Sequence, residues 1–389
     1  MSWRKISAWA LGLVVVAIAA FLTFAPGIAE SGMNRIQGSG IWPVSVRAKA
    51  LHKTLFVADM HADTLLWKRD FADQATRGHV DLPRLAQGHV ALQILSSVTK
   101  TPKGQNYDSN SDKTDNITLL AVAQLQPVRT WGSLLERSLW HAEKLHRDVA
   151  ANPKALRLVL TRRDLAALAA DQGLAPRPVG TMLSVEGAHN LEGKLANLDR
   201  LYDAGFRMIG LAHFFDNELA GSMHGERKYG LTPFGLKVMR AMEAKSMLVD
   251  LAHCSHACFA DVMRLAARPV VVSHGGVKAT CNTNRNLSDD ELRLLAKNGG
   301  VIGIGYWDAA VCAPTPAATA RAIVHAVAVA GIDHVGLGSD FDGSVTTGFD
   351  TAHLDAVTQA LIDAGLSDAD IAKVMGGNVQ RLLLAGLPA

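Results

Sequence analysis

From residue 54 onward, short apolar runs alternate about eight times with segments of helical character. We predict strands at eight of these runs: Leu55–Asp59, His89–Leu95, Val179–Val185, Arg207–Leu211, Met247–Leu251, Pro269–Val272, Val301–Gly305 and His334–Gly338. Several runs are almost continuously hydrophobic, which is typical of parallel strands that are buried on both faces. The alternation therefore predicts an α/β chain folded as a (β/α)₈ TIM barrel.

The segments between the strands supply the predicted helices. Four of them follow the third to sixth strands, at Leu195–Ala204, Pro233–Ala244, Ser255–Ala267 and Ser288–Asn298. Ser288 and Glu291 have the spacing of a capping box, which marks a helix start. The interval Thr99–Ala175 is longer than the others and contains helix-like stretches at Ile117–Gln126 and Ser133–Val149. We therefore expect a helical insertion after the second strand, which can contribute to the rim of a site.

A doubly wound open sheet is the alternative α/β architecture. Such a sheet would need a glycine-rich phosphate-binding turn after its first strand. The first predicted strand is followed instead by Met60–Asp63, and the glycine-rich segment Gly336–Asp340 lies at the last strand. The barrel is therefore the favoured fold.

The first thirty residues differ from the rest of the chain. Arg4 and Lys5 precede the run Ala8–Ala25, which is about 18 residues long and contains no charged side chain. A basic end followed by an apolar segment near the minimum length of a membrane span predicts translocation of the downstream chain. Gly27 and Ala29 have the small-x-small spacing of a cleavage site. A signal peptide removed after Ala29 and an uncleaved membrane anchor both stay open.

We accordingly divide the chain into a signal peptide or membrane anchor, residues 1–30, and a barrel, residues 31–389. The protein is expected to be exported, either to the periplasm or anchored in a membrane and facing the periplasm or the outside. Hydrophobic residues make up 49% of the chain and charged residues 19%, which allows a large core and excludes extensive disorder. A net charge of +3 without a dense Lys/Arg stripe argues against nucleic-acid binding.

The four cysteines are Cys254, Cys258, Cys281 and Cys312. The first two are four residues apart, which is not the C-x-x-C spacing of zinc or redox sites. A barrel of this size does not need disulfides for its stability. We interpret the cysteines as ordinary thiols or one optional disulfide.

Polar side chains recur where the predicted strands end. They are His61 and Asp63 after the first strand, Glu186 after the third, and then His213, His253, His274 and Asp340 after the fourth, fifth, sixth and eighth. Each has a plainer interpretation by itself, because lone histidines are usually hydrogen-bonded core residues and buried acids often pair with arginine. On a barrel, however, all of these strand ends meet at one mouth. Imidazoles and carboxylates together suit Zn²⁺, so the shared placement favours a metal site.

Seven motifs make the chain resemble a known family. They are Asp59-Met-His61-Ala-Asp63, Ser184-Val-Glu186-Gly, Leu211-Ala-His213, Asp250-Leu-Ala-His253, Ser273-His274, Asn284-Arg285-Asn286 and Gly338-Ser-Asp340-Phe-Asp-Gly343. In this order, from about residue 54 to Leu384, they resemble the membrane (renal) dipeptidase family, a binuclear zinc branch of the amidohydrolase barrels. The resemblance implies a hydrolase that cleaves dipeptides and holds two Zn²⁺ ions per chain.

The same resemblance implies roles for individual residues. His61 and Asp63 would hold one zinc ion, Glu186 would bridge both ions, and His253 and His274 would complete the second zinc site.

Four further positions concern the substrate. By the same resemblance, His213 would contact the dipeptide and stabilise charge at the scissile carbonyl, and Asp340 would transfer protons. Arg285 would bind the C-terminal carboxylate, which suits its rigid fork of donors. Tyr306 would line the substrate pocket. The stretch Phe214–Ser222 departs from the mammalian members and puts the side-chain preference in doubt.

The implied chemistry is physically consistent. Two Zn²⁺ ions about 3.5–4 Å apart can share one water and lower its pKa, so that a metal-bridged hydroxide attacks the peptide carbonyl. A zinc ion and His213 would stabilise the oxyanion, and Asp340 would carry the proton from the water to the leaving amine. The sequence contains no G-x-S-x-G elbow, and we expect no covalent acyl-enzyme.

Two other interpretations stay open. One is a different amidohydrolase activity on lactones, phosphoesters or other amides, although those barrels usually begin with H-x-H rather than His61-Ala-Asp63. The other is a non-catalytic membrane-tethered barrel, which predicts losses among ligands that are all present here. The family often allows a D-residue at the C-terminal position of the dipeptide. Its members pair as homodimers, although the sequence indicates no particular interface.

Overall fold

Eight parallel strands follow one another around a closed barrel. They are β2 (Val57–Ala62), β3 (Val90–Val98), β5 (Val179–Glu186), β6 (Phe206–Gly210), β7 (Leu248–Asp250), β8 (Val271–Gly275), β9 (Val301–Ile304) and β10 (Val335–Leu337). In this computed structural model, which describes residues 3–174 and 176–389, β10 pairs with β2 and β3 pairs with β5, so the ring closes. Every predicted strand is present within a few residues of its expected bounds, and the (β/α)₈ prediction is confirmed.

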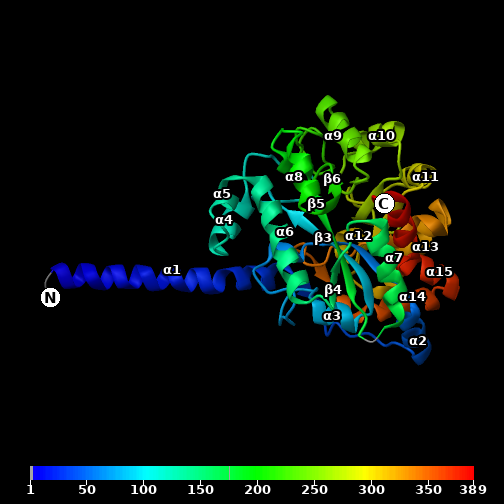
Figure 1. Cartoon of the computed structure of the whole chain (residues 1–389), viewed down its shortest axis with the longest axis horizontal. Helices are drawn as coiled ribbons and strands as arrows, with labels where there is room; N and C mark the ends of the chain where they lie inside the picture. The colour runs from blue at the N-terminus through cyan, green and yellow to red at the C-terminus, as the bar shows by residue number, and fades with distance from the viewer. Residues whose placement is uncertain (1–2, 175) are drawn as a thin grey trace.

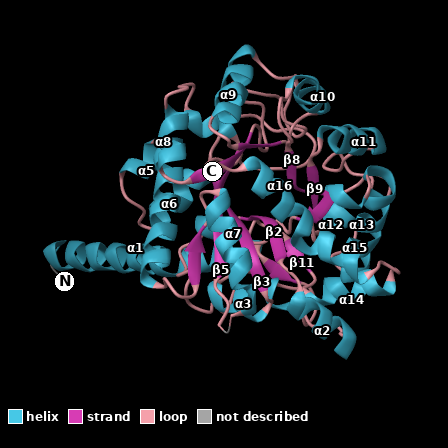
Figure 2. Cartoon of the chain, turned by 45° about the vertical axis from the view of Figure 1, so that its right-hand side comes forward, coloured by secondary structure: helices cyan, strands magenta, loops and turns pink. Residues whose placement is uncertain are grey.

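Helices cover the outside of the barrel (Figures 1 and 2). They are α2 (Val46–Thr54), α3 (Leu82–Gln87), α8 (Asn197–Asp203), α9 (Pro233–Ala244), α10 (His256–Leu265), α11 (Asp289–Asn298), α12 (Asp308–Val311), α13 (Pro316–Ala330), α14 (Asp355–Asp363), α15 (Asp368–Ala372) and α16 (Asn378–Gly386). The predicted capping box is present at α11, where Ser288 and Glu291 exchange hydrogen bonds between side chain and backbone. This helix start signal in the sequence thus corresponds to a real cap.

The segment between β3 and β5 contains the predicted helical insertion and one further strand. Its elements are α4 (Asn116–Ala123), α5 (Arg129–Gly132), α6 (Leu134–Ala151), β4 (Leu156–Leu158) and α7 (Arg162–Ala170). β4 pairs in parallel with the first residues of β5 and makes the sheet nine-stranded. We did not predict β4, because Leu-Arg-Leu is too short to form an apolar run. Ala175, where the predicted insertion ends, lies outside the described residues.

The glycines near the last barrel strand allow neighbouring strands to approach closely. A Cβ atom on Gly338 would lie 1.9 Å from the carbonyl oxygen of Ser273, and one on Gly303 would lie 2.2 Å from the same atom. Non-bonded atoms do not approach so closely, so side chains at these two positions would push the strands apart. Strand packing therefore accounts for Gly338 in the glycine-rich segment at the last strand.

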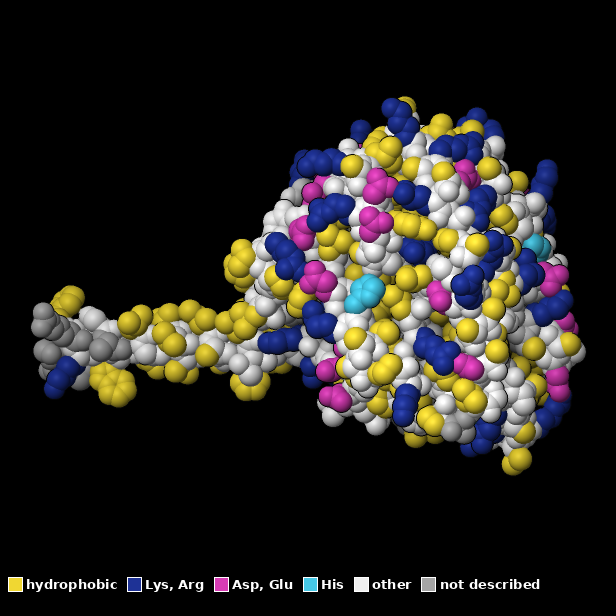
Figure 3. All heavy atoms as spheres, viewed as in Figure 1, with side chains coloured by type: hydrophobic (Ala, Val, Ile, Leu, Met, Phe, Trp, Pro, Cys, Tyr) yellow, Lys and Arg dark blue, Asp and Glu magenta, His cyan; other side chains and the backbone are white. Residues whose placement is uncertain are grey.

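The N-terminal apolar segment forms one long helix, α1 (Trp3–Met33), which projects from the barrel (Figures 1 and 3). By length and composition, Trp9–Met33 could cross a membrane. The helix continues without interruption through residue 30, where we placed the boundary of the targeting segment. It is followed by β1 (Arg35–Ile36), which pairs with β11 (Thr346–Thr347) near the last barrel strand. The inner end of α1 is therefore joined directly to the barrel.

Two disulfide bonds connect the four cysteines, Cys254 with Cys258 and Cys281 with Cys312. The prediction of free thiols or one optional disulfide is therefore wrong. The Cα atoms are 5.5 Å and 5.3 Å apart, within the range that disulfides require. Spacing in the sequence could not reveal that the loop after β8 folds against α12 and brings the second pair together.

Loss of the Cys281–Cys312 bond is expected to lower the free energy of unfolding by roughly 4 kcal/mol, because this bond closes the longer loop, with a separation of 31 residues. The Cys254–Cys258 bond has a separation of 4 residues, so its loss should cost roughly half as much. Urea unfolding of C281S/C312S and C254S/C258S, each against the wild type, measures the difference. Equal decreases in the free energy of unfolding in the two variants would contradict the loop-length explanation.

Candidate metal centre

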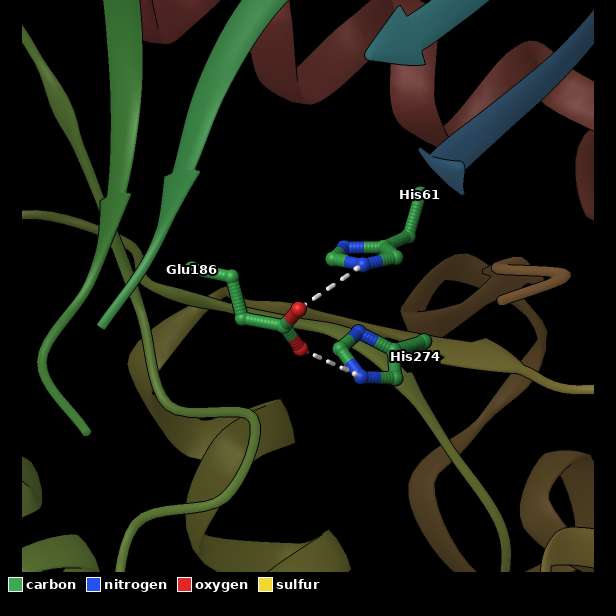
Figure 4. Close-up of side chains that lie close together, drawn as sticks. All are labelled: His61, Glu186 and His274. Carbon is green, nitrogen blue, oxygen red and sulfur yellow. Dashed lines mark ion pairs between the residues drawn. The ribbon is translucent and has the colours of Figure 1, made fainter. Parts of the chain in front are cut away.

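The carboxyl ends of the barrel strands bring seven polar side chains together. They are His61 in β2, Glu186 at the end of β5, His274 in β8, and Asp63, His213, His253 and Asp340 just after strand ends. Each is at most 9% exposed. Figure 4 shows Glu186 facing His61 with one carboxylate oxygen and His274 with the other. The residues that the sequence predicted at one mouth are neighbours, because parallel strands all end on the same side of the barrel.

Glu186 lies at the centre of the cluster. Its Oε1 atom is 2.8 Å from Nε2 of His253 and 3.3 Å from Nε2 of His274. Its Oε2 atom is 3.4 Å from Nε2 of His213 and 3.7 Å from Nε2 of His61. One carboxylate therefore faces two groups of nitrogen donors, one group at each oxygen.

Three overlapping sets of donors could each hold a metal ion. They are His61 with Glu186 and His274, Glu186 with His213 and His253, and His61 with Asp63 and Asp340, and within each set the donor atoms lie within 4.8 Å of one another. Among the described residues, Nε2 of His61 and Oδ1 of Asp63 are buried without a hydrogen-bond partner. Buried polar atoms left unpaired are costly, and a cation would satisfy both. The donor set therefore fits a metal centre.

Burial and neighbouring charges shift the pKa values of the carboxyl groups. Burial raises the pKa of Asp340 well above its usual value, and the nearby charge of Glu186 adds to the rise. Burial also raises the pKa of Asp63, to about 6. Burial acts on Glu186 in the same direction, but the charges of His213 and His61 outweigh it and hold the pKa of Glu186 well below its usual value. A divalent cation would relieve the repulsion among these three carboxylates.

Two of the histidines are held in the form that binds a metal. Burial lowers the pKa of His253 and of His274 well below the usual value for imidazole, so both rings are neutral near pH 7. Nδ1 of His274 lies 2.9 Å from Oγ of Ser273, which donates to Oδ2 of Asp250 at 2.6 Å. Such partners fix the tautomer and the direction of a ligand ring. Nε2 of His274 is therefore free to face Glu186.

Asp59 supports the opposite side of the centre. Its Oδ1 atom accepts hydrogen bonds from the backbone N–H of His61 at 3.0 Å and from the hydroxyl and backbone N–H of Ser339 at 3.1 Å. Asp59 and Asp250 are positioning residues to which sequence reasoning assigned no role. The feature of the sequence that could have revealed them is a carboxylate two or three residues before a predicted ligand histidine.

The backbone is constrained at two members of the cluster. His253 and Asp340 have φ angles of 64° and 59°, in the left-handed region that side chains other than glycine rarely adopt. Strain of this kind concentrates at functional sites, where the surrounding structure enforces it. At both positions it turns the chain sharply after a strand and keeps the side chain at the cluster.

A cavity of about 610 Å³ adjoins the cluster. On the side of the metal centre it is lined by Asp63, Glu186, His213, His253, Arg285 and Asp340. Arg285 is 1% exposed, and its Nη2 donates to the carbonyl of His274 at 2.7 Å, whereas its Nε has no partner among the described residues. A buried guanidinium with a free donor suits an anionic group in the cavity.

The structure does not support the predicted pocket-lining role of Tyr306. Its side chain is fully buried and packs against Phe341 and Phe349, and its hydroxyl reaches Oδ2 of Asp59 at 3.4 Å. Tyr306 is not among the described residues that line the cavity, whereas the next residue, Trp307, is. Alternate residues of an extended segment face opposite sides, so a shift of one position decides which ring lines the cavity.

Tyr107 is a cavity residue that sequence reasoning missed. It lies in the loop before α4, and its hydroxyl accepts a hydrogen bond from Nε1 of Trp307 at 3.0 Å. Its backbone carbonyl lies 2.8 Å from Nδ1 of His224 and accepts a hydrogen bond from Asn284. Burial raises the pKa of Tyr107 to about 12, so the hydroxyl keeps its proton. The insertion therefore contributes a polar group to the site.

Known proteins resemble this chain in both sequence and fold. A sequence profile described as membrane dipeptidase (Peptidase family M19) matches residues 45–385, a range that includes every member of the cluster. The dipeptidase aclJ of Aspergillus oryzae is 29% identical over 371 residues, which cover 88% of this chain and 82% of that protein.

Two solved structures share the fold. The probable dipeptidase PvdM of Pseudomonas aeruginosa has a TM-score of 0.72 and 21% identity, over 87% of this chain and 96% of that chain. A metallopeptidase of Rhodobacter sphaeroides, solved with a phosphinate mimic of the dipeptide L-Ala-D-Ala, has a TM-score of 0.70 and 22% identity, over 85% of this chain and 99% of that chain. The family profile covers most of the chain, including all the strands of the barrel. The chain therefore belongs to the membrane dipeptidase family, peptidase family M19, and is a metallo-dipeptidase.

Proposed function

We propose that this metallo-dipeptidase uses two Zn²⁺ ions. His61 and Asp63 would hold one ion, His253 and His274 the other, and Glu186 would bridge them. The observation that carries the proposal is the position of Glu186, whose two carboxylate oxygens face separate groups of donors. Histidine and carboxylate donors without cysteine are typical of catalytic zinc sites.

The chain's own residues would bind and orient the dipeptide. Zinc, when bound, would supply Lewis acidity and an activated water. Arg285 would hold the C-terminal carboxylate of the substrate through its unpaired donor. His213, which lines the cavity, would contact the scissile carbonyl and stabilise charge that develops on its oxygen. Asp340 lines the same cavity and would move the proton from the attacking water to the leaving amine.

We further propose that the C-terminal residue of the dipeptide can have the D configuration. Support comes from the Rhodobacter sphaeroides metallopeptidase, which was solved with a mimic of L-Ala-D-Ala. A guanidinium such as Arg285 recognises the terminal carboxylate and not the side chain beside it. L-L and L-D dipeptides would then share the same anchor and differ in side-chain contacts.

We also propose that the protein is exported and that α1 holds it in a membrane, with the barrel on the outer side. Arg4 and Lys5 before the apolar run favour that orientation. The two disulfide bonds are typical of proteins in oxidising compartments. Pairing as a homodimer stays a prediction.

Zinc content and dipeptide hydrolysis, measured on one preparation, test the proposed function. We expect about two zinc ions per chain and turnover of both L-L and L-D dipeptides. Chelation should abolish turnover, and added Zn²⁺ should restore it, because every predicted ligand lies at the reaction centre. Two metal ions without dipeptide turnover would redirect the substrate search to other amides, lactones and phosphoesters. Absence of both metal and turnover would contradict the proposal.

A further inference from the structure

The inner turns of α1 are built into the barrel. Glu30 is 1% exposed, and its two carboxylate oxygens accept hydrogen bonds from Nε of Arg69 and Nε of Arg77, each at 2.6 Å. Just beyond the helix, Oδ1 of Asn34 accepts a hydrogen bond from the backbone N–H of Ser344 at 2.8 Å. A buried carboxylate held by two guanidinium groups fixes both the direction and the rotation of the helix. These contacts turn one face of α1 toward the cavity.

That face of α1 forms part of the cavity wall. We define the α1 stripe as Phe21, Ala25, Ala29 and Met33, which line the cavity and follow one another at four-residue spacing. Residues at this spacing lie along one side of a helix. Helix α4 contacts α1, lies beside its base in Figure 1, and contributes Ile117 and Leu120 to the same cavity. The α1 stripe and α4 thus form an apolar end of the enclosure.

We propose that the α1 stripe is a substrate-selecting wall of the active site and that it favours dipeptides with a large aliphatic or aromatic side chain. The inference rests on the proposed function. Glu186 and Arg285 line the same cavity, so a dipeptide held there shares one enclosure with the stripe. The stripe and the facing α4 side chains are hydrophobic. An apolar substrate side chain therefore gains free energy by leaving water for this wall, whereas a small or charged side chain does not.

The proposal requires α1 to remain on the mature protein. Cleavage after Ala29 would remove Phe21, Ala25 and Ala29 from the wall and open this end of the cavity to solvent. The intact mass of the full-length protein, purified from membranes, should therefore show that residues 21–33 are retained. A mature chain that begins at Glu30 would overturn the proposal.

Matched substitutions on the two faces of α1 test the selecting role. Met33→Asn places a neutral polar group in the stripe, and Ser31→Asn makes a similar change at an exposed residue of the same helix that does not line the cavity. The readout is the ratio of kcat/KM for L-Leu-L-Ala to that for L-Ala-L-Ala, measured on the full chain loaded with zinc. We expect the ratio to fall roughly fivefold or more in Met33→Asn and to stay at the wild-type value in Ser31→Asn, because loss of apolar contact affects the larger side chain most.

Phe21→Asn, in the same stripe, provides a second variant if Met33→Asn folds poorly. A lower ratio in this variant, with an unchanged ratio in Ser31→Asn, supports the proposal. Unchanged ratios in both wall variants, in protein that turns over L-Ala-L-Ala, would overturn the selecting wall and leave the dipeptidase function intact. A wild-type enzyme that contains no zinc and hydrolyses neither these dipeptides nor their L-D counterparts would overturn both.

Discussion

Glu186→Gln is expected to lower kcat/KM for dipeptides by at least about 1000-fold, or about 4 kcal/mol of transition-state stabilisation. The glutamine side chain has nearly the same shape as glutamate but carries no charge. Only its single oxygen can coordinate a metal ion, whereas the carboxylate offers two oxygens. In the proposed centre, Oε1 faces the donors His253 and His274, and Oε2 faces His61. Loss of one ligand atom would release at least one metal ion. Zinc content and turnover should therefore fall together.

Elemental analysis of the variant measures its zinc content, and dipeptide hydrolysis assays on the same sample measure turnover. Circular dichroism checks that the variant is folded. Glu226→Gln is a suitable control, because it removes a carboxylate from an exposed residue and should leave metal content and turnover unchanged. Titration with excess Zn²⁺ distinguishes weakened metal binding from loss of the catalytic carboxylate. Two firmly bound zinc ions with wild-type turnover in Glu186→Gln would refute a bridging role.

Asp340→Asn is expected to lower kcat by roughly 10²–10⁴-fold, the usual contribution of a positioned general acid or base, with a much smaller change in KM. Oδ1 of Asp340 lies 3.9 Å from Nε2 of His61, and the side chain borders the cavity. An amide of the same shape can still contact substrate but cannot take up and release a proton. If proton transfer is the role of Asp340, two zinc ions should remain bound.

Zinc content separates this role from metal binding, because Asp340 also belongs to one of the candidate donor sets. Asp308→Asn, at an exposed residue of α12, supplies the matched control. A fall in zinc that parallels the fall in kcat would make Asp340 a ligand instead. Unchanged kcat would exclude both roles.

The barrel could be predicted from the sequence because parallel strands buried on both faces carry long apolar runs. The runs at Val179–Val185 and Val301–Gly305 correspond closely to β5 and β9. The strand ends were predicted less accurately. β2 continues to Ala62, whereas the predicted strand ended at Asp59. The prediction stopped early because the run of apolar residues is interrupted where the polar residues of the cluster begin. The gathering of polar side chains at one mouth of the barrel was predictable for a related reason. A polar residue at the end of a buried strand costs free energy unless it is paired or binds a ligand.

Features that depend on contacts distant in sequence could not be predicted. The disulfide between Cys281 and Cys312 joins the loop after β8 to a residue just after α12. The lining of the cavity by Trp307, and not by Tyr306, depends on the direction of one extended residue after β9. The attachment of Glu30 to two arginines shows why an apolar N-terminal segment can look independent in the sequence and still belong to the folded core.

If α1 holds the protein in a membrane, as proposed, its attachment beside the cavity changes the quantity that governs encounter with substrate. When α1 lies in a bilayer, the mouth of the barrel moves laterally within a thin layer next to the lipid surface. Molecules with large apolar groups partition into that layer, so their number per unit area, and not their bulk concentration, sets the rate of encounter. An assay in detergent solution would then understate the preference for such molecules, and the same enzyme in vesicles would follow the surface density of its substrate.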